Sequence, residues 1–219
     1  MRLRAVAFVK RTPSALLLVA QLVGVVAYPF MEQTTTGRAL FAIFGIVVLA
    51  LAVLVIRTTP FLWWVSLLVA VPAMVLLALQ AFSDSAALFA WSSGFEAVLY
   101  LYAALSMTAY MLEDTRVTID ELFAIGTVFT LLAWAFAYVF VVLQAIQPAS
   151  FTSGADDAHT WMDLLFLSFT ILTGTGLSEI QPATGHAKSV VMLEQVVGVF
   201  YIAMVVTRLI GLQALRKRA

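Results

Sequence analysis

The feature that most constrains this chain is a series of apolar runs that are each long enough to cross a lipid bilayer. A spanning helix needs about 20 mostly apolar residues. Hydrophobic residues make up 63% of the sequence and charged residues 11%, which leaves too few polar side chains to cover an apolar interior in water. The runs lie at residues 14–30, 38–56, 61–80, 86–112, 122–146 and 189–215. We therefore expect an all-α integral membrane protein with six transmembrane helices.

The basic residues indicate how these helices cross the membrane. Lys and Arg gather near both ends of the chain, and Arg57 and Arg116 fall in two of the connections between runs. Because cytoplasmic loops carry an excess of Lys and Arg, we expect both termini in the cytoplasm, as an even number of spans requires. The remaining connections are acidic, which agrees with an outer position. The predicted location is the cell membrane.

Composition also excludes several kinds of site. The formal net charge is zero, so no basic surface for nucleic acid is expected. The chain has no cysteine, which excludes disulfides and thiolate metal sites. The two histidines, His159 and His186, lie outside the apolar runs and belong to no serine–histidine pairing motif. We therefore expect no enzyme, no organic cofactor and no soluble partner, and lipid as the surroundings.

The segment between the fifth and sixth runs does not have the character of an ordinary loop. Residues 147–159 are polar, and the following TWMDLLFLSFTILT is apolar but too short to cross a bilayer. Thr160 and Asp157 are the candidates for capping this short helix. The sequence Thr-Gly-Thr-Gly comes next, and non-helical backbone at membrane depth survives only when it is buried in protein or lines water. We therefore expect a re-entrant loop whose backbone is the working surface.

This order of elements resembles the pore domain of the tetrameric potassium channel superfamily, and in particular small bacterial channels with a two-helix pore. It comprises an outer helix, a short pore helix, a Thr- and Gly-containing strand, Glu179-Ile180-x-Pro182 and an inner helix. The resemblance covers residues 117–215. It implies a pore domain at residues 117–219 in a bacterial inner membrane. The first four apolar runs, which show no such resemblance, predict a separate four-helix membrane domain at residues 1–116. Because one chain supplies one loop and a ring of carbonyls needs several, we expect a homotetramer.

Alignment on Glu179-Ile180-x-Pro182 assigns the filter positions. The family pattern is a threonine followed by Thr-Val-Gly-Tyr-Gly, and the matching residues here are Thr173, Gly174, Thr175, Gly176, Leu177 and Ser178. The resemblance implies that backbone carbonyls of residues 173–177 replace the hydration shell of potassium or another monovalent cation. The backbone of Thr173, Gly174, Thr175 and Gly176 would coordinate the ion, and the Thr173 hydroxyl would add an inner ring of oxygens.

The filter departs from the family pattern at four of its last five positions. Only Gly176 keeps its expected identity, and Leu177 replaces a tyrosine. Ser178 occupies a position where the family has glycine in left-handed backbone, a conformation that serine adopts only with strain. Either Ser178 is strained or the outermost ion site is rebuilt.

Two further residues of the pore region, Glu179 and Gly198, each allow two interpretations. Glu179 is expected at the outer mouth, where four copies would form an acidic ring that concentrates cations. Its other interpretation is a structural carboxylate bonded to pore-helix amides. Gly198 lies 20 residues beyond Ser178, about where inner helices of the superfamily carry a hinge glycine. Its other interpretation is close helix packing, since glycine is common in membrane helices.

Two carboxylates lie within apolar runs, and ionisable groups there are expensive enough to suggest a structural or functional role. Glu194, on the predicted inner helix, is expected to bond to the pore helix or a neighbour. Glu96, in the fourth run, is expected to pair with a polar group such as Ser92 or Ser93. Its other interpretations are cation binding and a place at the tetramer interface.

The sequence thus predicts a passive cation channel that conducts potassium. The first four runs lack the repeated arginines of a voltage sensor, and the absence of internal repeats argues against a secondary transporter. Two alternatives remain open: a non-selective monovalent cation channel, and a non-conducting sensor or accessory protein on a channel fold.

Overall fold

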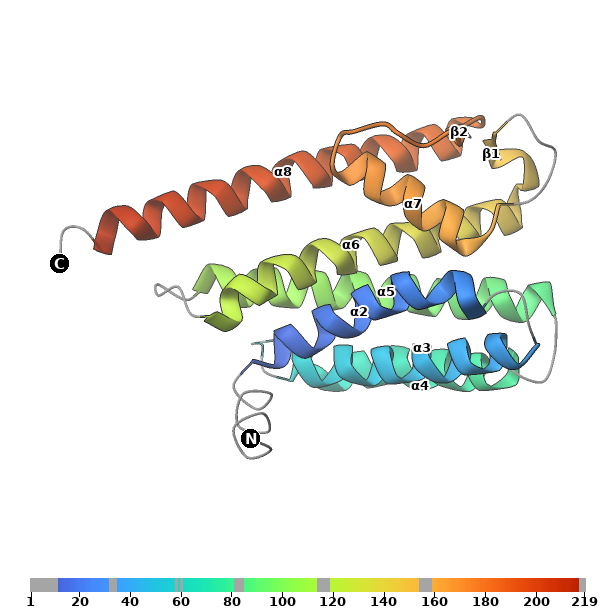
Figure 1. The fold of residues 1–219 in the computed structure, drawn as a ribbon, viewed down its shortest axis with the longest axis horizontal. Helices are drawn as coiled ribbons and strands as arrows, with labels where there is room; N and C mark the ends of the chain where they lie inside the picture. The colour runs from blue at the N-terminus through green and yellow to red at the C-terminus, as the bar shows by residue number, and fades with distance from the viewer. Residues whose placement is uncertain are drawn as a thin grey trace. The chain divides into compact units, whose positions relative to one another are not determined.

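The computed structural model describes residues 12–31, 35–57, 59, 61–80, 85–113, 119–153 and 159–216. Long helices dominate it (Figure 1). The elements are α2 (Pro13–Met31), α3 (Thr35–Ile56), α4 (Trp63–Gln80), α5 (Ala86–Glu113), α6 (Ile119–Ile146), η1 (Pro148–Ser150), β1 (Phe151–Thr152), α7 (Trp161–Leu172), β2 (Gln181–Pro182) and α8 (Gly185–Arg216). Arg116 and Asp157 lie outside the described residues.

Six of the described helices are long and apolar enough to cross a membrane, which confirms the expected multi-pass membrane protein. They are Pro13–Met31, Ala39–Ile56, Trp63–Gln80, Ala86–Leu112, Asp120–Ile146 and Gly185–Ile210. The last one begins four residues earlier than the apolar pattern predicted. The reason is a local cap, because the Thr184 hydroxyl accepts a hydrogen bond from the amide of Ala187 at 3.3 Å.

The chain forms two compact units, Met1–Leu132 and Ala133–Ala219, and the boundary falls inside α6. In the first unit α2 contacts α3, α3 contacts α4 and α5, and α4 contacts α5. Small side chains at these contacts, such as the fully buried Ala70, Ala73 and Ala103, let membrane helices approach closely.

Polar contacts join α2 to the first half of α6 within the first unit. Asp120 accepts hydrogen bonds from the backbone amide and the hydroxyl of Ser14, both at 3.2 Å, and so caps α2 from another helix. Two turns further on, the Thr127 hydroxyl donates to the Ser14 carbonyl at 2.9 Å. The buried Thr130 hydroxyl lies 2.7 Å from Oε1 of the buried Gln21. These bonds hold α2 against α6 at several points.

We predict that Thr130→Val destabilises the protein by about 1 kcal/mol, because a buried Gln21 oxygen loses its donor. Thermal unfolding in detergent, measured as Tm, would report the loss. The matched control is Thr108→Val, since the Thr108 hydroxyl donates to the Ala104 carbonyl of its own helix at 2.8 Å. Equal Tm values for the two variants would contradict the prediction.

Candidate functional site

The short helix α7 begins at a complete capping box. The Thr160 hydroxyl accepts from the Asp163 amide at 3.3 Å, and the Thr160 amide donates to the Asp163 carboxylate at 2.9 Å. Thr160, one of the two residues predicted to cap this helix, is therefore the N-cap. The helix has 12 residues, which at about 1.5 Å per residue is too short to cross a hydrocarbon layer about 30 Å thick.

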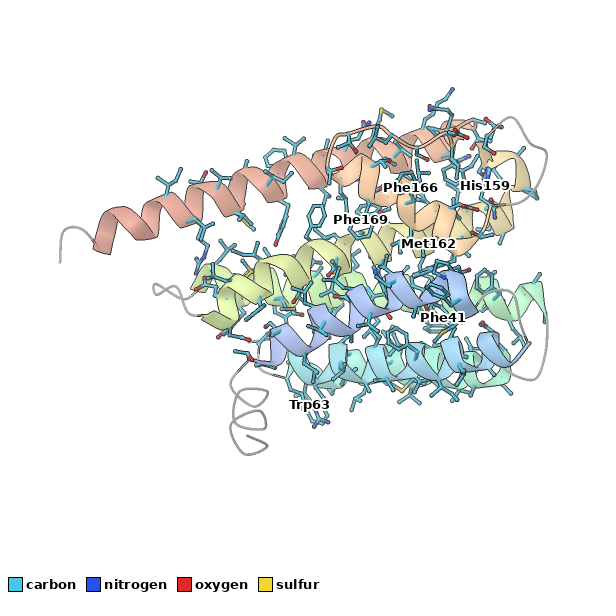
Figure 2. All side chains as sticks on the ribbon, viewed as in Figure 1. Phe41, Trp63, His159, Met162, Phe166 and Phe169 are labelled. Atoms are coloured by element: carbon cyan, nitrogen blue, oxygen red, sulfur yellow. The ribbon has the colours of Figure 1, made fainter. Side chains whose placement is uncertain are left out.

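The start of α7 is fixed to the second half of α6. Trp161 packs edge-on against Trp134, with ring centroids 5.2 Å apart. Just before the helix, the Gln144 side chain bonds the backbone of His159 twice, donating to its carbonyl at 3.0 Å and accepting from its amide at 3.1 Å. Figure 2 shows His159 beside the start of α7. A two-point amide clamp and an aromatic contact thus set the entry to the helix.

The loop that contains α7 closes on itself through a small antiparallel pair, β1 and β2, that the sequence did not predict. Phe151 pairs with Pro182, and Thr152 pairs with Gln181. The Ala183 amide adds a bond of 2.8 Å to the Ser150 carbonyl. The chain therefore leaves this point, forms α7 and returns to the same point before α8 begins (Figure 1).

The end of α7 is a Schellman motif made by the Thr-Gly-Thr-Gly sequence. The Gly174 amide donates to the Ile171 carbonyl at 3.0 Å, and the Thr175 amide donates to the Thr170 carbonyl at 3.0 Å. The motif needs a left-handed residue, and Gly174 has φ +70. Gly176 has φ +64, and its amide also donates to Thr170, at 3.3 Å.

These amide bonds fix the direction of the backbone carbonyls in the filter segment, residues 173–178. The described residues contain no cis peptide bond, so each carbonyl points opposite to the amide of the next residue. Because the amides of Gly174, Thr175 and Gly176 point back at α7, the three preceding carbonyls point away from it. Those oxygens accept no hydrogen bond from any part of the chain that the structure describes. Three consecutive carbonyls are thus directed outward and free to bind a ligand.

The threonine hydroxyls at the start of the filter segment are held in place by α7. The Thr173 hydroxyl donates to the Phe169 carbonyl at 2.7 Å. The Thr175 hydroxyl lies 3.0 Å from the Thr173 hydroxyl. Since Thr173 gives its proton to the helix, its oxygen accepts from the Thr175 hydroxyl and keeps one further lone pair.

At the C-terminal end of the filter segment, Ser178 is not strained, so the first of the two alternatives for it was wrong. No described residue other than glycine has positive φ. The Ser178 hydroxyl instead accepts from the Ile180 amide at 3.2 Å, which starts the return of the chain to β2. The left-handed positions are Gly174 and Gly176, two residues earlier than the family pattern implied. Glu179 is exposed, and its carboxylate forms no hydrogen bond with α7 among the described residues.

Helix α8 lies directly against the end of α7 (Figure 1). A Cβ atom built on the buried Gly198 would lie 2.5 Å from the Leu172 carbonyl oxygen and 2.9 Å from its Cα. Both are backbone atoms, which cannot move aside as the end of a flexible side chain can. A side chain larger than hydrogen does not fit at Gly198 without separating the two helices.

One turn earlier on α8, the fully buried Glu194 bonds to the Ser168 hydroxyl of α7. The same hydroxyl lies 2.9 Å from the Ala133 carbonyl of α6. The second carboxylate oxygen of Glu194 is buried without a hydrogen bond to the described residues. Ser168 therefore joins α6, α7 and α8 at a single buried point.

The other intramembrane carboxylate, Glu96 of α5, is buried but does not bond to either serine proposed as its partner. Ser92 donates to the Phe89 carbonyl at 3.0 Å and accepts a bond from Gln80. The buried Ser93 hydroxyl has no partner among the described residues. Tyr100, which is also buried, lies one turn further along α5.

Sequence reasoning did not identify the Gln144 clamp, Ser168 as the partner of Glu194, or the Thr170 carbonyl as the acceptor of two amides. Gln144 and Ser168 are polar residues inside apolar helices. That exception to the local pattern was the available signal for both, because polar groups at membrane depth must find partners. The Thr170 acceptor is a backbone carbonyl, which no residue type signals.

The fold and the site together define a multi-pass membrane protein with a carbonyl-presenting loop between its last two long helices. Residues 97–212, more than half of the chain, match the family model described as an ion channel. The protein therefore belongs to this ion channel family. The matched region includes the second half of α5, all of α6 and α7, the filter segment and most of α8. No curated protein and no solved structure matches the chain.

We predict that Gly198→Ala lowers the stability of the protein by about 1 to 3 kcal/mol, because the added methyl group overpacks the contact with Leu172. A glycine that served only as a hinge would give the opposite sign, since alanine stabilises a helix interior by about 0.5 to 1 kcal/mol relative to glycine. Thermal unfolding in detergent distinguishes the two. Gly185→Ala is the control, because a Cβ there would meet nothing within 4 Å.

Proposed function

We propose that the chain forms a homotetrameric, passive channel for monovalent cations that conducts potassium. The observation that carries the proposal is the set of outward-directed carbonyls of Thr173, Gly174 and Thr175, none of which bonds to the described residues. Carbonyl oxygens of this kind can replace the hydration shell of potassium. One chain supplies only one such row, so a ring around an ion requires several copies.

In this proposal the loop formed by α7 and the filter segment is re-entrant. It enters the membrane from the outer side at β1 and returns to that side at β2, while both chain termini lie in the cytoplasm. The exposed Glu179 then stands at the outer mouth, where a ring of carboxylates raises the local cation concentration. The Thr173 hydroxyl lies at the inner end of the filter segment and supplies a further oxygen.

A non-selective monovalent cation channel is the second candidate, and the outer half of the filter segment favours it. Left-handed backbone occurs at Gly174 and Gly176 and not at Ser178, so the outermost carbonyls are arranged differently from those of the family pattern. Leu177, 72% exposed, offers no hydroxyl to brace the segment. Fewer well-formed carbonyl sites reduce discrimination between potassium and sodium.

We predict that Gly176→Ala reduces potassium flux by about tenfold or more. A Cβ at Gly176 meets nothing within 4 Å, so the substitution is not excluded by space. It does force an L-residue to keep φ +64 at a cost of about 1 to 2 kcal/mol, and relief of that strain redirects the neighbouring carbonyl. The measurement is flux through purified protein in liposomes, with potassium, sodium and caesium gradients applied separately.

Gly185→Ala is the control for this experiment, because that glycine has open space and no positive φ. Potassium-selective flux that is lost only in Gly176→Ala would support the carbonyl filter. Equal flux of all three cations in the unsubstituted protein would favour the non-selective channel. Absence of flux under every gradient would favour a non-conducting protein.

A further inference from the structure

The turn between α3 and α4 carries an arginine for which the described chain supplies no counter-ion. Arg57 is exposed, and its guanidinium forms no hydrogen bond or ion pair with any residue that the structure describes. A guanidinium has five N–H donors in a planar, fork-like arrangement. Arg57 therefore presents a positive charge and a set of donors that can bind an anion.

One face of this guanidinium lies over an aromatic ring. The Cζ atom of Arg57 is 4.7 Å from the centroid of the Trp63 ring, which is within the distance of roughly 6 Å that defines a cation–π contact. Trp63 is the first residue of α4 (Figure 2). The contact covers a face of the guanidinium, and the N–H donors, which lie in its plane, remain available at its edge.

Hydrogen bonds fix the turn that positions Arg57 and Trp63. The amide and the hydroxyl of Thr59 both donate to the Ile56 carbonyl, at 3.0 and 2.7 Å, where α3 ends. The Tyr102 hydroxyl of α5 donates to the Leu62 carbonyl at 3.1 Å, directly before α4 begins. Because the turn is held near both of its ends, the arginine and the indole are in place before any ligand binds.

The same turn lies at the edge of the hydrocarbon layer. The spans on its two sides are Ala39–Ile56 and Trp63–Gln80, each of 18 residues, or about 27 Å of helix. Since the layer is about 30 Å thick, both helices reach its boundary at this turn, and the polar headgroup region lies directly outside it. Tryptophan is enriched at this depth, and residues 61–64 are all apolar and exposed.

We propose that Arg57 and Trp63 form a binding site for the phosphate of an anionic phospholipid. The donors of Arg57 hold the phosphate oxygens, Trp63 keeps the guanidinium in place, and the apolar surface of residues 61–64 contacts the acyl chains. A zwitterionic lipid brings its own ammonium group, which the uncompensated charge of Arg57 repels, so the site prefers a headgroup with net negative charge. This inference does not depend on the proposed channel function, since both residues precede the matched region 97–212.

Native mass spectrometry of the full-length protein in detergent measures lipid binding directly, with phosphatidylglycerol or phosphatidylcholine added at equal concentration. We expect the unsubstituted protein to bind phosphatidylglycerol more tightly. Arg57→Gln should lower the affinity for phosphatidylglycerol by about fivefold, the factor that one basic residue contributes at an anionic membrane surface, and should leave the affinity for phosphatidylcholine unchanged. The matched control is Lys188→Gln, because Lys188 is also an exposed basic residue near the end of a span.

A second pair of variants tests the aromatic contact and keeps the test valid if Arg57→Gln does not fold. Trp63→Leu retains an apolar side chain but removes the ring, and should weaken phosphatidylglycerol binding by about two- to fivefold. Trp64→Leu, its exposed neighbour, should leave binding unchanged. Arg57→Lys keeps the charge and loses the planar fork, so its affinity should lie between those of Arg57→Gln and the unsubstituted protein.

Several results would overturn the proposal. Equal affinity of the unsubstituted protein for the two lipids would show that net charge is not recognised. Equal losses in Arg57→Gln and Lys188→Gln, or in Trp63→Leu and Trp64→Leu, would show a general attraction of the surface and no site at Arg57. Displacement of bound phosphatidylglycerol by soluble glycerol phosphate at equal concentration would assign the site to a free phosphate and not to a lipid. The measurement involves no ion flux, so its failure and the failure of the channel function are distinguishable.

Discussion

The hydrogen bonds to the Thr170 carbonyl are the interaction on which the rest of the site depends. The last carbonyls of a helix have no donors within the helix, so the chain that follows α7 supplies them. It does so with the amides of Thr175 and Gly176, at 3.0 and 3.3 Å. This arrangement requires left-handed backbone, which glycine provides, and it turns the intervening carbonyls away from the helix. The same hydrogen bonds therefore end α7 and direct the carbonyls away from it.

Several contacts from distant parts of the second unit hold α7 in the position at which its end presents the carbonyls. The Gln144 clamp and Trp134 fix its start, and Gly198 fixes the distance between its end and α8. Ser168 joins it to both neighbouring helices at its buried side. The short helix has few residues of its own for packing, so these contacts decide its position. Displacing any one of these contacts would shift α7 and, with it, all of the carbonyls that follow its end.

Much of the fold could be predicted from the sequence because its signals are local. Apolar run length determines the six spans, and Thr160 with Asp163 determines the start of α7. The end of α7 was also encoded locally, since a glycine directly after the last apolar residue is the usual helix stop. Alignment to the family pattern instead assigned that glycine, Gly174, to a filter position, and it suggested strain at Ser178. The Ser168 and Gln144 contacts could not be predicted, because they join residues 15 to 35 positions apart whose pairing depends on tertiary packing.

The direction of α7 also has an electrical consequence. Aligned peptide dipoles place roughly half a negative charge at the C-terminus of a helix, and α7 ends directly before the filter segment. Its opposite end is balanced by the Asp163 carboxylate of the capping box. Each copy of the chain around an ion would add the same partial charge. This part of the attraction for a cation would come from the backbone itself, and no change of proton concentration could remove it.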